Sequence, residues 1–180
     1  MATTRFILGI ICLVNVIGHG LPDRNLLNTA AQEQILNIAR SQLEVRESGK
    51  NNFGTMIGQY LSYTRLRQGN PYCAAFISWV FFKGGYSAPR SAWSPDLFPK
   101  SRMVKFPQPA DLLGIYSKDR KRIVHCGIVE RLQHDWVISI EGNTNSDGSA
   151  DGDGNYRKWR HKNTIRCFSR WLARKEVNDD

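Results

Sequence analysis

The first half of the chain carries apolar residues at helical spacing, separated by polar breaks. Apolar positions between 35 and 43 form one broad stripe, which predicts a helix from Thr29 to about Arg46. A second helix is expected from Thr55 to about Arg67, because its apolar residues recur at the same spacing. The run from Cys73 to Phe82 is almost wholly apolar, follows a turn containing proline and ends at two glycines. It therefore predicts a third helix, which is buried.

The second half of the chain changes from proline-rich loops to short runs typical of strands. Prolines at positions 95, 107 and 109 disfavour helix in the connecting region. Four strands are expected, at Leu112–Tyr116, Ile123–Glu130, Trp136–Glu141 and Thr164–Phe168. Helices followed by strands indicate an α+β domain, in which N-terminal helices pack on a C-terminal antiparallel sheet.

The first twenty residues have the three-part pattern of a secretory signal peptide. Arg5 supplies a positive charge, residues 6–17 are almost wholly apolar, and residues 18–20 are small enough for cleavage. The apolar stretch is too short to span a bilayer comfortably, so we favour a cleaved signal over a permanent membrane anchor. We therefore expect a signal peptide at 1–20, an N-terminal segment at 21–33 and one domain at 34–175. The mature protein would be secreted or periplasmic.

The charge balance of the chain is strongly basic. Lysine and arginine total 25 against 16 acidic residues, a formal net charge of +9, which becomes +8 once the single charge of Arg5 leaves with the signal. Such a balance favours a polyanionic partner, either nucleic acid, a membrane surface or an anionic cell-wall polymer, although it also suits a solvated surface. The chain has no zinc-finger, recognition-helix or aromatic RNA-binding pattern, and it begins with a secretion signal. We therefore expect no nucleic-acid partner.

The position of Cys73 at the start of a buried helix makes it a candidate nucleophile. Free backbone N–H groups and the positive end of the helix dipole favour a thiolate over a thiol. The same N–H groups can stabilise an oxyanion that develops during attack on a carbonyl. A small buried core residue is the alternative reading of this cysteine. A nucleophile also needs a base.

His125, in the second expected strand, is the candidate base. If the turn that follows is a five-residue loop, Glu130 lies opposite Trp136 and His125 lies opposite Glu141. A shift of two residues places His125 opposite Asn143 instead. Either register puts a hydrogen-bond acceptor beside the imidazole, as in triads where a third group fixes the histidine tautomer.

These motifs together resemble the CHAP family of cysteine, histidine-dependent amidohydrolases and peptidases, which are papain-like folds that cut peptidoglycan. The similarity runs from about Gln34 to Trp159, and the order and spacing of the motifs are more specific than any one of them. The matching segments are Glu47–Asn52, Tyr72–Val80, Pro109–Asp111, His125–Val129 and Glu141–Thr144.

The resemblance implies a nucleophile at Cys73, a base at His125 and an orienting role for Glu141 or Asn143. It also implies a secreted peptidoglycan hydrolase, either an endopeptidase or an N-acetylmuramoyl-L-alanine amidase, which needs no cofactor. Peptidoglycan, with other anionic wall polymers, would be the partner of a monomeric protein. Two alternatives stay open: a non-catalytic cationic module that binds the wall, and a cysteine acyltransferase or protease of the same fold.

Two further cysteines, Cys126 and Cys167, fall in expected strands. Because side chains alternate along a strand, Cys126 is expected to point away from the face that carries His125. In an oxidising compartment a Cys126–Cys167 disulfide is favoured over two separate buried thiols.

The loop at 145–155 is rich in glycine and aspartate. Its start matches a calcium-binding EF-hand loop at Asp147, Ser149 and Asp151, but Lys158 stands where the closing glutamate would be. We therefore expect a glycine-rich loop beside the substrate and no metal site.

Overall fold

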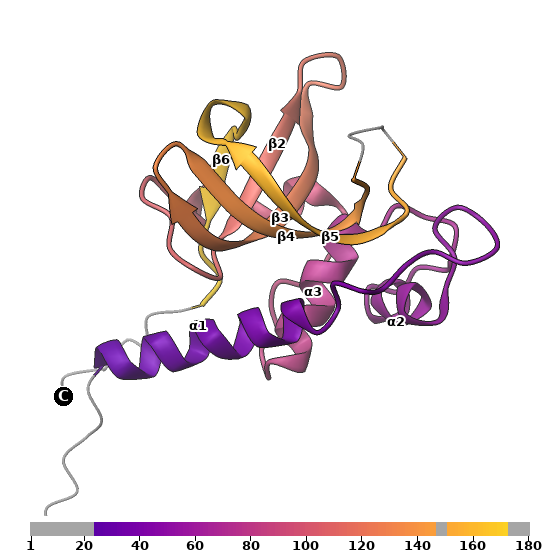
Figure 1. Cartoon of the computed structure of the whole chain (residues 1–180), viewed down its shortest axis with the longest axis horizontal. Helices are drawn as coiled ribbons and strands as arrows, with labels where there is room; N and C mark the ends of the chain where they lie inside the picture. The colour runs from indigo at the N-terminus through magenta and orange to yellow at the C-terminus, as the bar shows by residue number, and fades with distance from the viewer. Residues whose placement is uncertain (1–23, 147–150, 173–180) are drawn as a thin grey trace, which may run out of the picture.

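The computed structural model describes residues 24–146 and 151–172. In these residues three α-helices pack against a six-stranded antiparallel sheet with strand order β1-β6-β2-β3-β4-β5, which confirms the α+β class (Figure 1). The predicted signal peptide, residues 147–150 of the glycine-rich loop and the last residues of the predicted domain lie outside the described residues. Within the two described ranges, no helix is both long enough and apolar enough to cross a membrane.

The helices are α1 (Arg24–Arg40), α2 (Thr55–Tyr63) and α3 (Cys73–Lys83). α3 begins where it was predicted to begin, and every residue from Cys73 to Phe81 is buried. α1 begins and ends earlier than predicted; at its C-terminus the chain turns, and Ser41 there donates its hydroxyl to the carbonyl of Ile38. α2 ends before Arg65, whose φ of +64° does not continue an α-helix.

The four predicted strands are present with altered bounds, and two more were missed. β5 is an edge strand in which only the first two residues are buried, so its sequence shows no apolar alternation. β1 has only two residues, too few to give a pattern. The strands are β1 (Met103–Val104), β2 (Leu112–Ser117), β3 (Arg122–Gln133), β4 (Trp136–Thr144), β5 (Gly154–His161) and β6 (Cys167–Ser169). Short 3₁₀ helices lie at Ser94–Leu97 (η1), Lys100–Arg102 (η2) and Lys162–Thr164 (η3).

The turn of the β3–β4 hairpin is tighter than predicted. Gln133 pairs with Trp136, so the loop has two residues instead of five. His134, the first of the two, has a φ of +53°, the left-handed conformation that two-residue hairpin turns require. The predicted pairing of Glu130 with Trp136 is therefore wrong.

A β-bulge at Glu130 restores one of the predicted registers further along the hairpin. Beyond the bulge Ile128 pairs with Ile140. Continued toward the start of β3, this register places His125 opposite Asn143, which is the second of the two arrangements expected from the sequence.

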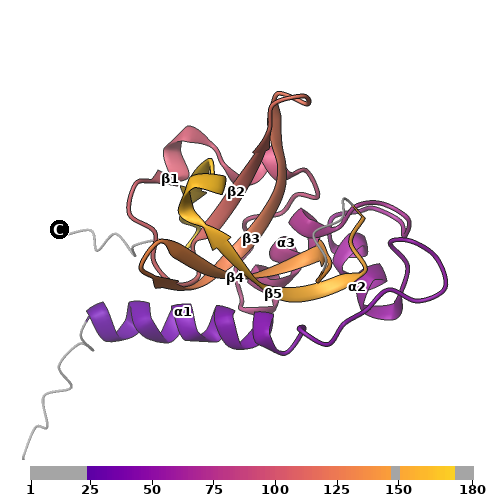
Figure 2. The ribbon, with the colours of Figure 1, turned by 45° about the horizontal axis from the view of Figure 1, so that its top comes forward.

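α3 lies at the centre of the fold, where it contacts the sheet and both other helices (Figures 1 and 2). A Cβ atom on Gly142 of β4 would lie 2.8 Å from the Cβ atom of Phe76, so the absence of a side chain allows α3 to approach β4 closely. Phe76 is three residues after Cys73. This contact therefore fixes the N-terminus of α3 against the end of β4.

An ion-pair network around Glu130 fixes α1 to the sheet. The Glu130 carboxylate is buried and accepts hydrogen bonds from Arg40 of α1 at 2.8 Å and from Arg157 of β5 at 2.6 Å. Burial by itself would raise the pKa of Glu130, but the hydrogen bonds from Arg157 and Arg40 outweigh burial and lower it. Three segments far apart in the sequence are joined through this one carboxylate.

Glu130→Gln is expected to lower the free energy of unfolding by about 1–2 kcal/mol, since Arg157 loses the carboxylate that it binds and Arg40 loses one of its two, while both arginines keep access to water. Urea denaturation at pH 7 measures the change. Glu33→Gln is the matched control, because Glu33 is exposed and pairs with one of the same arginines, Arg40. The control should change stability by less than about 0.5 kcal/mol. Equal losses in both variants would contradict a special role for Glu130.

Candidate active site

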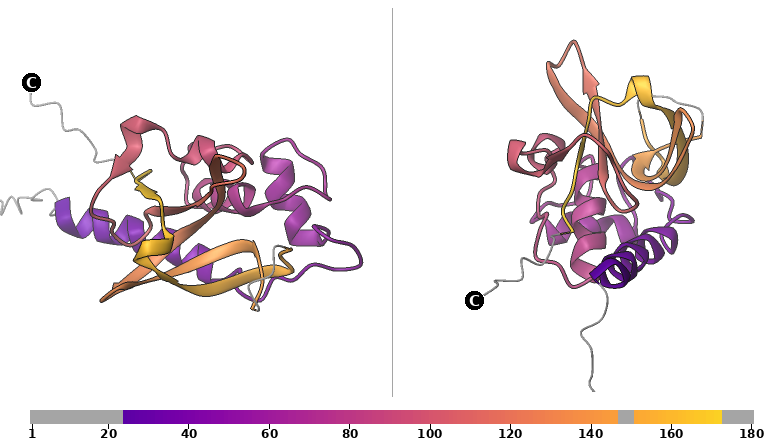
Figure 3. Two further views of the ribbon diagram at one scale, coloured as in Figure 1. Left: turned by 90° about the horizontal axis from the view of Figure 1, so that it is seen from above. Right: turned by 90° about the vertical axis from the view of Figure 1, so that its left-hand side faces the viewer.

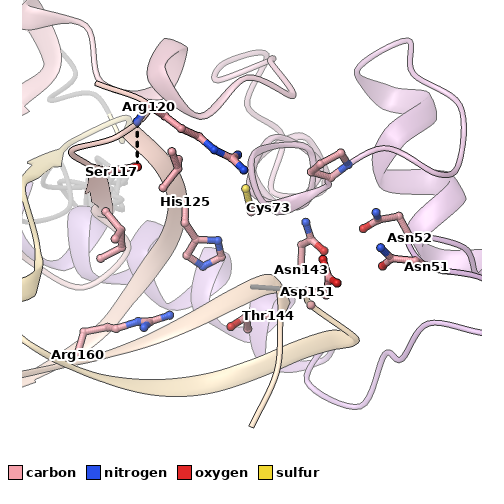
Figure 4. Close-up of a pocket in the computed structure, with 14 residues that line it drawn as sticks. Asn51, Asn52, Cys73, Ser117, Arg120, His125, Asn143, Thr144, Asp151 and Arg160 are labelled. Atoms are coloured by element: carbon pink, nitrogen blue, oxygen red, sulfur yellow. Dashed lines mark hydrogen bonds between the residues drawn. The ribbon is translucent and has the colours of Figure 1, made fainter. Parts of the chain in front are cut away.

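Cys73 is the first residue of α3 and borders a cavity of about 520 Å³ (Figure 4). Its side chain is only 5% exposed. No side chain caps the N-terminus of α3, so the first backbone N–H groups of the helix remain available to a negative charge. The local setting that the sequence predicted for a reactive thiol is therefore present.

The structure brings His125 beside Glu141. The Nε2 atom of His125 lies 2.8 Å from Oε2 of Glu141. A Cβ atom on Gly127 would lie 2.6 Å from Cγ of Glu141, so the glycine after the histidine leaves the space that this carboxylate occupies. Of the two acceptors that the sequence offered for orienting His125, Glu141 makes this hydrogen bond.

Glu141 is itself held by two residues that the sequence did not indicate. Arg160 of β5 binds both carboxylate oxygens, through Nε at 2.9 Å and Nη2 at 2.5 Å. Ser139 donates its hydroxyl to Oε1 at 2.6 Å. Glu141 is fully buried, and this support keeps its carboxylate ionised and in place.

The electrostatics of the site favour a thiolate beside an imidazolium. A hydrogen bond from Cys126 lowers the pKa of the Cys73 thiol well below its usual value; burial opposes this, and the hydrogen bond and charge of His125 add to it. Burial lowers the pKa of His125, but hydrogen bonds to Cys73 and Glu141 together outweigh it and raise that pKa to about 10. Burial would also raise the pKa of Glu141, yet Arg160 and His125 hold it well below its usual range. At neutral pH the three groups therefore carry charges of alternating sign.

Ser94 and Cys126 complete the surroundings of the Cys73 sulfur. The Ser94 hydroxyl, at the start of η1, lies 3.3 Å from Sγ of Cys73, and Cys126 donates to the same hydroxyl at 3.7 Å. The prediction that Cys126 points away from the catalytic face is therefore wrong. A β-bulge at Val124 disturbs the strand beside His125, so that both His125 and Cys126 reach Cys73.

The expected disulfide between Cys126 and Cys167 is not formed, and both residues are free thiols. Gly114 of β2 pairs with Cys126 on one side and with Cys167 on the other. Two strand spacings, roughly 10 Å, exceed the Cα separation that a disulfide spans. The strand that lies between them is β2, which was predicted as a strand; its place between β3 and β6 was not predicted, and it keeps the two sulfurs apart.

Asn143 lines the cavity and makes no hydrogen bond to His125 in the described residues. Its φ is +55°, the left-handed region, at the point where the β4–β5 pairing is irregular. In Figure 4 it lies on the same side of Cys73 as Asp151, Asn51 and Asn52. Asn143 therefore belongs to the wall of the cavity that faces away from Arg160.

The glycine-rich loop is described only outside residues 147–150, which contain Asp147 and Ser149. At its far end Gly152 packs on the backbone of Asn143, where a Cβ atom would come within 2.2 Å of the Asn143 carbonyl carbon. In the part of the chain that the structure describes, no three His, Cys, Asp or Glu side chains are grouped as metal ligands would be.

Comparisons with known proteins do not assign the chain to a family. No protein-family model matches it, and no curated protein matches it. Among solved structures, one described as "The crystal structure of Ly7917" matches with a TM-score of 0.45 and 14% sequence identity. That match covers 76% of this chain and 60% of the other, so the chain spans less than two thirds of that structure. The function proposed below therefore rests on the geometry of the site and on the sequence motifs.

Proposed function

We propose that this protein is a secreted cysteine hydrolase that cuts an amide bond of peptidoglycan, as an endopeptidase or an N-acetylmuramoyl-L-alanine amidase. The observation that carries the proposal is that Cys73 and His125 line one open cavity and interact, while the buried Glu141 binds His125 from behind. A nucleophile, a base and a group that orients the base are the three parts that acyl transfer to a thiol requires.

In the first half of the reaction, the Cys73 thiolate attacks the carbonyl carbon of the amide and forms a C–S bond. The backbone N–H groups at the start of α3 stabilise the oxyanion that develops. Because Nε2 of His125 faces Glu141, Nδ1 is the ring nitrogen that serves Cys73 and the substrate. His125 gives its Nδ1 proton to the leaving nitrogen as the C–N bond breaks, which leaves a thioester on Cys73 and a neutral imidazole.

In the second half, the neutral imidazole takes a proton from a water molecule, and the oxygen attacks the thioester carbon. Collapse of the second tetrahedral intermediate breaks the C–S bond and releases a carboxylic acid. The Cys73 thiolate and the His125 imidazolium are then restored. Glu141 stabilises the imidazolium that is present at the start and end of this cycle.

The choice of peptidoglycan rests on the resemblance of the sequence motifs to the CHAP family and on the basic charge of the chain. A cell wall rich in carboxylates and phosphates attracts a protein whose formal net charge is +9 with the signal peptide and +8 without Arg5. A monomeric, secreted enzyme that requires no cofactor fits this substrate, and it needs no nucleic-acid partner or membrane anchor.

The proposal is tested by digestion of purified peptidoglycan with the mature protein under reducing conditions, with the products identified by mass spectrometry. We expect released muropeptides whose new ends identify the amide bond that is cut. Intact peptidoglycan that binds the protein and releases nothing would instead favour a non-catalytic wall-binding module. Transfer of the acyl group to added amines, or cleavage of ordinary proteins, would favour an acyltransferase or a general protease.

A further inference from the structure

The β2–β3 hairpin carries a basic tip that borders the catalytic cavity. The hairpin projects beyond the rest of the sheet (Figures 1 and 3), and residues 118–122 at its tip include four lysines and arginines and one aspartate. Arg120 is the one residue of this tip that lines the cavity. Its guanidinium extends from the hairpin into the cavity, in the direction of Cys73 (Figure 4).

Among the described residues, Arg120 has no acidic partner. Arg160, the other arginine of the cavity, donates hydrogen bonds to both carboxylate oxygens of Glu141. In residues 24–146 and 151–172, no carboxylate lies within ion-pair distance of Arg120; its one recorded hydrogen bond is donated by its backbone N–H to the hydroxyl of Ser117. An exposed, unpaired guanidinium at a reaction cavity offers a planar pair of donors that matches a carboxylate.

The position of the base decides which half of the substrate Arg120 meets. His125 must reach the leaving nitrogen to protonate it, so the leaving half of the substrate lies on the His125 side of Cys73. His125 and Arg120 belong to the same hairpin. The wall on the other side of Cys73 carries neutral amides and an acid, from Asn51, Asn52 and Asp151 (Figure 4).

We propose that Arg120 is a specificity residue, which binds a free carboxylate on the leaving half of the substrate. This inference rests on the proposed hydrolase function and adds which half of the substrate carries the negative charge. The residue whose nitrogen is released carries an anionic carboxylate, and the acyl half carries uncharged or cationic groups. Amidation of that carboxylate removes the charge that Arg120 recognises.

The test uses two synthetic stem peptides of one sequence, in which the residue after the cut bond bears either a free carboxylate or a carboxamide. The wild-type protein should prefer the carboxylate peptide in kcat/KM by about 10-fold, since an ion pair in contact with water is of modest strength. Arg120→Gln should reduce the preference to within about 2-fold, because kcat/KM should fall on the carboxylate peptide alone. Lys118→Gln is the matched control: it makes the same charge change at the same hairpin tip, and Lys118 does not line the cavity. It should keep the wild-type preference.

Several outcomes would overturn the inference. If Arg120→Gln lowered kcat/KM equally on both peptides, the arginine would support the fold or the thiolate instead of binding the substrate carboxylate. An equal loss of preference in Lys118→Gln would indicate general charge attraction. Equal cleavage of the two peptides by the wild type would overturn the inference and leave the hydrolase intact. Release of whole stem peptides from peptidoglycan, with both synthetic peptides left intact, would identify an amidase and would overturn the inference, because the residue that an amidase releases has its carboxyl group in a peptide bond. If neither the peptides nor peptidoglycan were cut, both proposals would fail.

Discussion

Replacement of Cys73 by alanine should abolish release of muropeptides, with a fall in rate of at least about 10⁴-fold. The alanine cannot form the thioester, and Cys126, the other thiol beside Cys73, is fully buried and does not line the cavity. Rates of muropeptide release, followed by mass spectrometry, give the measurement.

The fold of Cys73→Ala should persist, since the change removes one sulfur and leaves the His125–Glu141–Arg160 network in place. We expect the Tm to stay within about 3 °C of the parent. Binding of the variant to peptidoglycan should also remain. Cys167→Ala is the matched control, because Cys167 lies in β6 and does not line the catalytic cavity; it should retain full activity. Turnover by Cys73→Ala within tenfold of the parent would remove this residue from the role of nucleophile.

Glu141→Gln should reduce kcat by about 10²–10⁴-fold, by analogy with the loss of the orienting carboxylate in other triads. Glutamine keeps the shape of the side chain and loses the charge that stabilises the His125 imidazolium. It also leaves Arg160, whose side chain is 27% exposed, without its carboxylate. Because a buried ion pair loses one partner, the free energy of unfolding should fall by about 2–4 kcal/mol. Kinetics and urea denaturation of the same preparation separate the two effects.

The pH profile distinguishes a catalytic role of Glu141 from a purely structural one. The pKa of His125 is raised to about 10, so the imidazolium and the activity that depends on it should persist until the pH approaches that value. The stabilisation associated with this proton is complete below the unfolded pKa of about 6.5 and is lost as the pH rises toward 10. Glu141 is one cause of the raised pKa. Glu141→Gln should therefore move the alkaline limb of kcat/KM to lower pH.

Two controls make this prediction falsifiable. Ser139→Ala removes one hydroxyl donor to Glu141 but leaves the carboxylate charge, which Arg160 still supports, and should leave the alkaline limb in place. Asn143→Ala tests the other residue that the sequence offered as the orienting group, and should reduce activity less than Glu141→Gln. An unshifted alkaline limb in Glu141→Gln, or a larger loss in Asn143→Ala, would show that Glu141 does not orient the base.

Local patterns in the sequence predicted much of the fold. The apolar run after Asn70-Pro71 gave the buried helix α3 and placed Cys73 at its start, because helix capping and burial depend on neighbouring residues. Short runs typical of strands gave β2, β3 and β4 for the same reason. β5 was missed because an edge strand buries few side chains, and with it Arg160 was missed as the partner of Glu141.

Long-range contacts could not be read from the sequence. The polar turn after Glu130 did not specify the loop: five residues were predicted and two are observed, and the register of the β3–β4 hairpin was left open between two arrangements. Ser94 carries no sequence signal as a partner of Cys73, because they are 21 residues apart and meet only when η1 packs beside α3.

By itself, then, the sequence determined the α+β class, the helix that begins at Cys73 and the strand that presents His125, since these depend on the spacing of nearby residues. The tertiary structure alone decided that Glu141 binds His125, that Cys126 approaches Cys73 and that a strand separates Cys126 from Cys167. Each of these depends on bulges and strand order, which are set by the packing of the whole chain rather than by neighbouring residues.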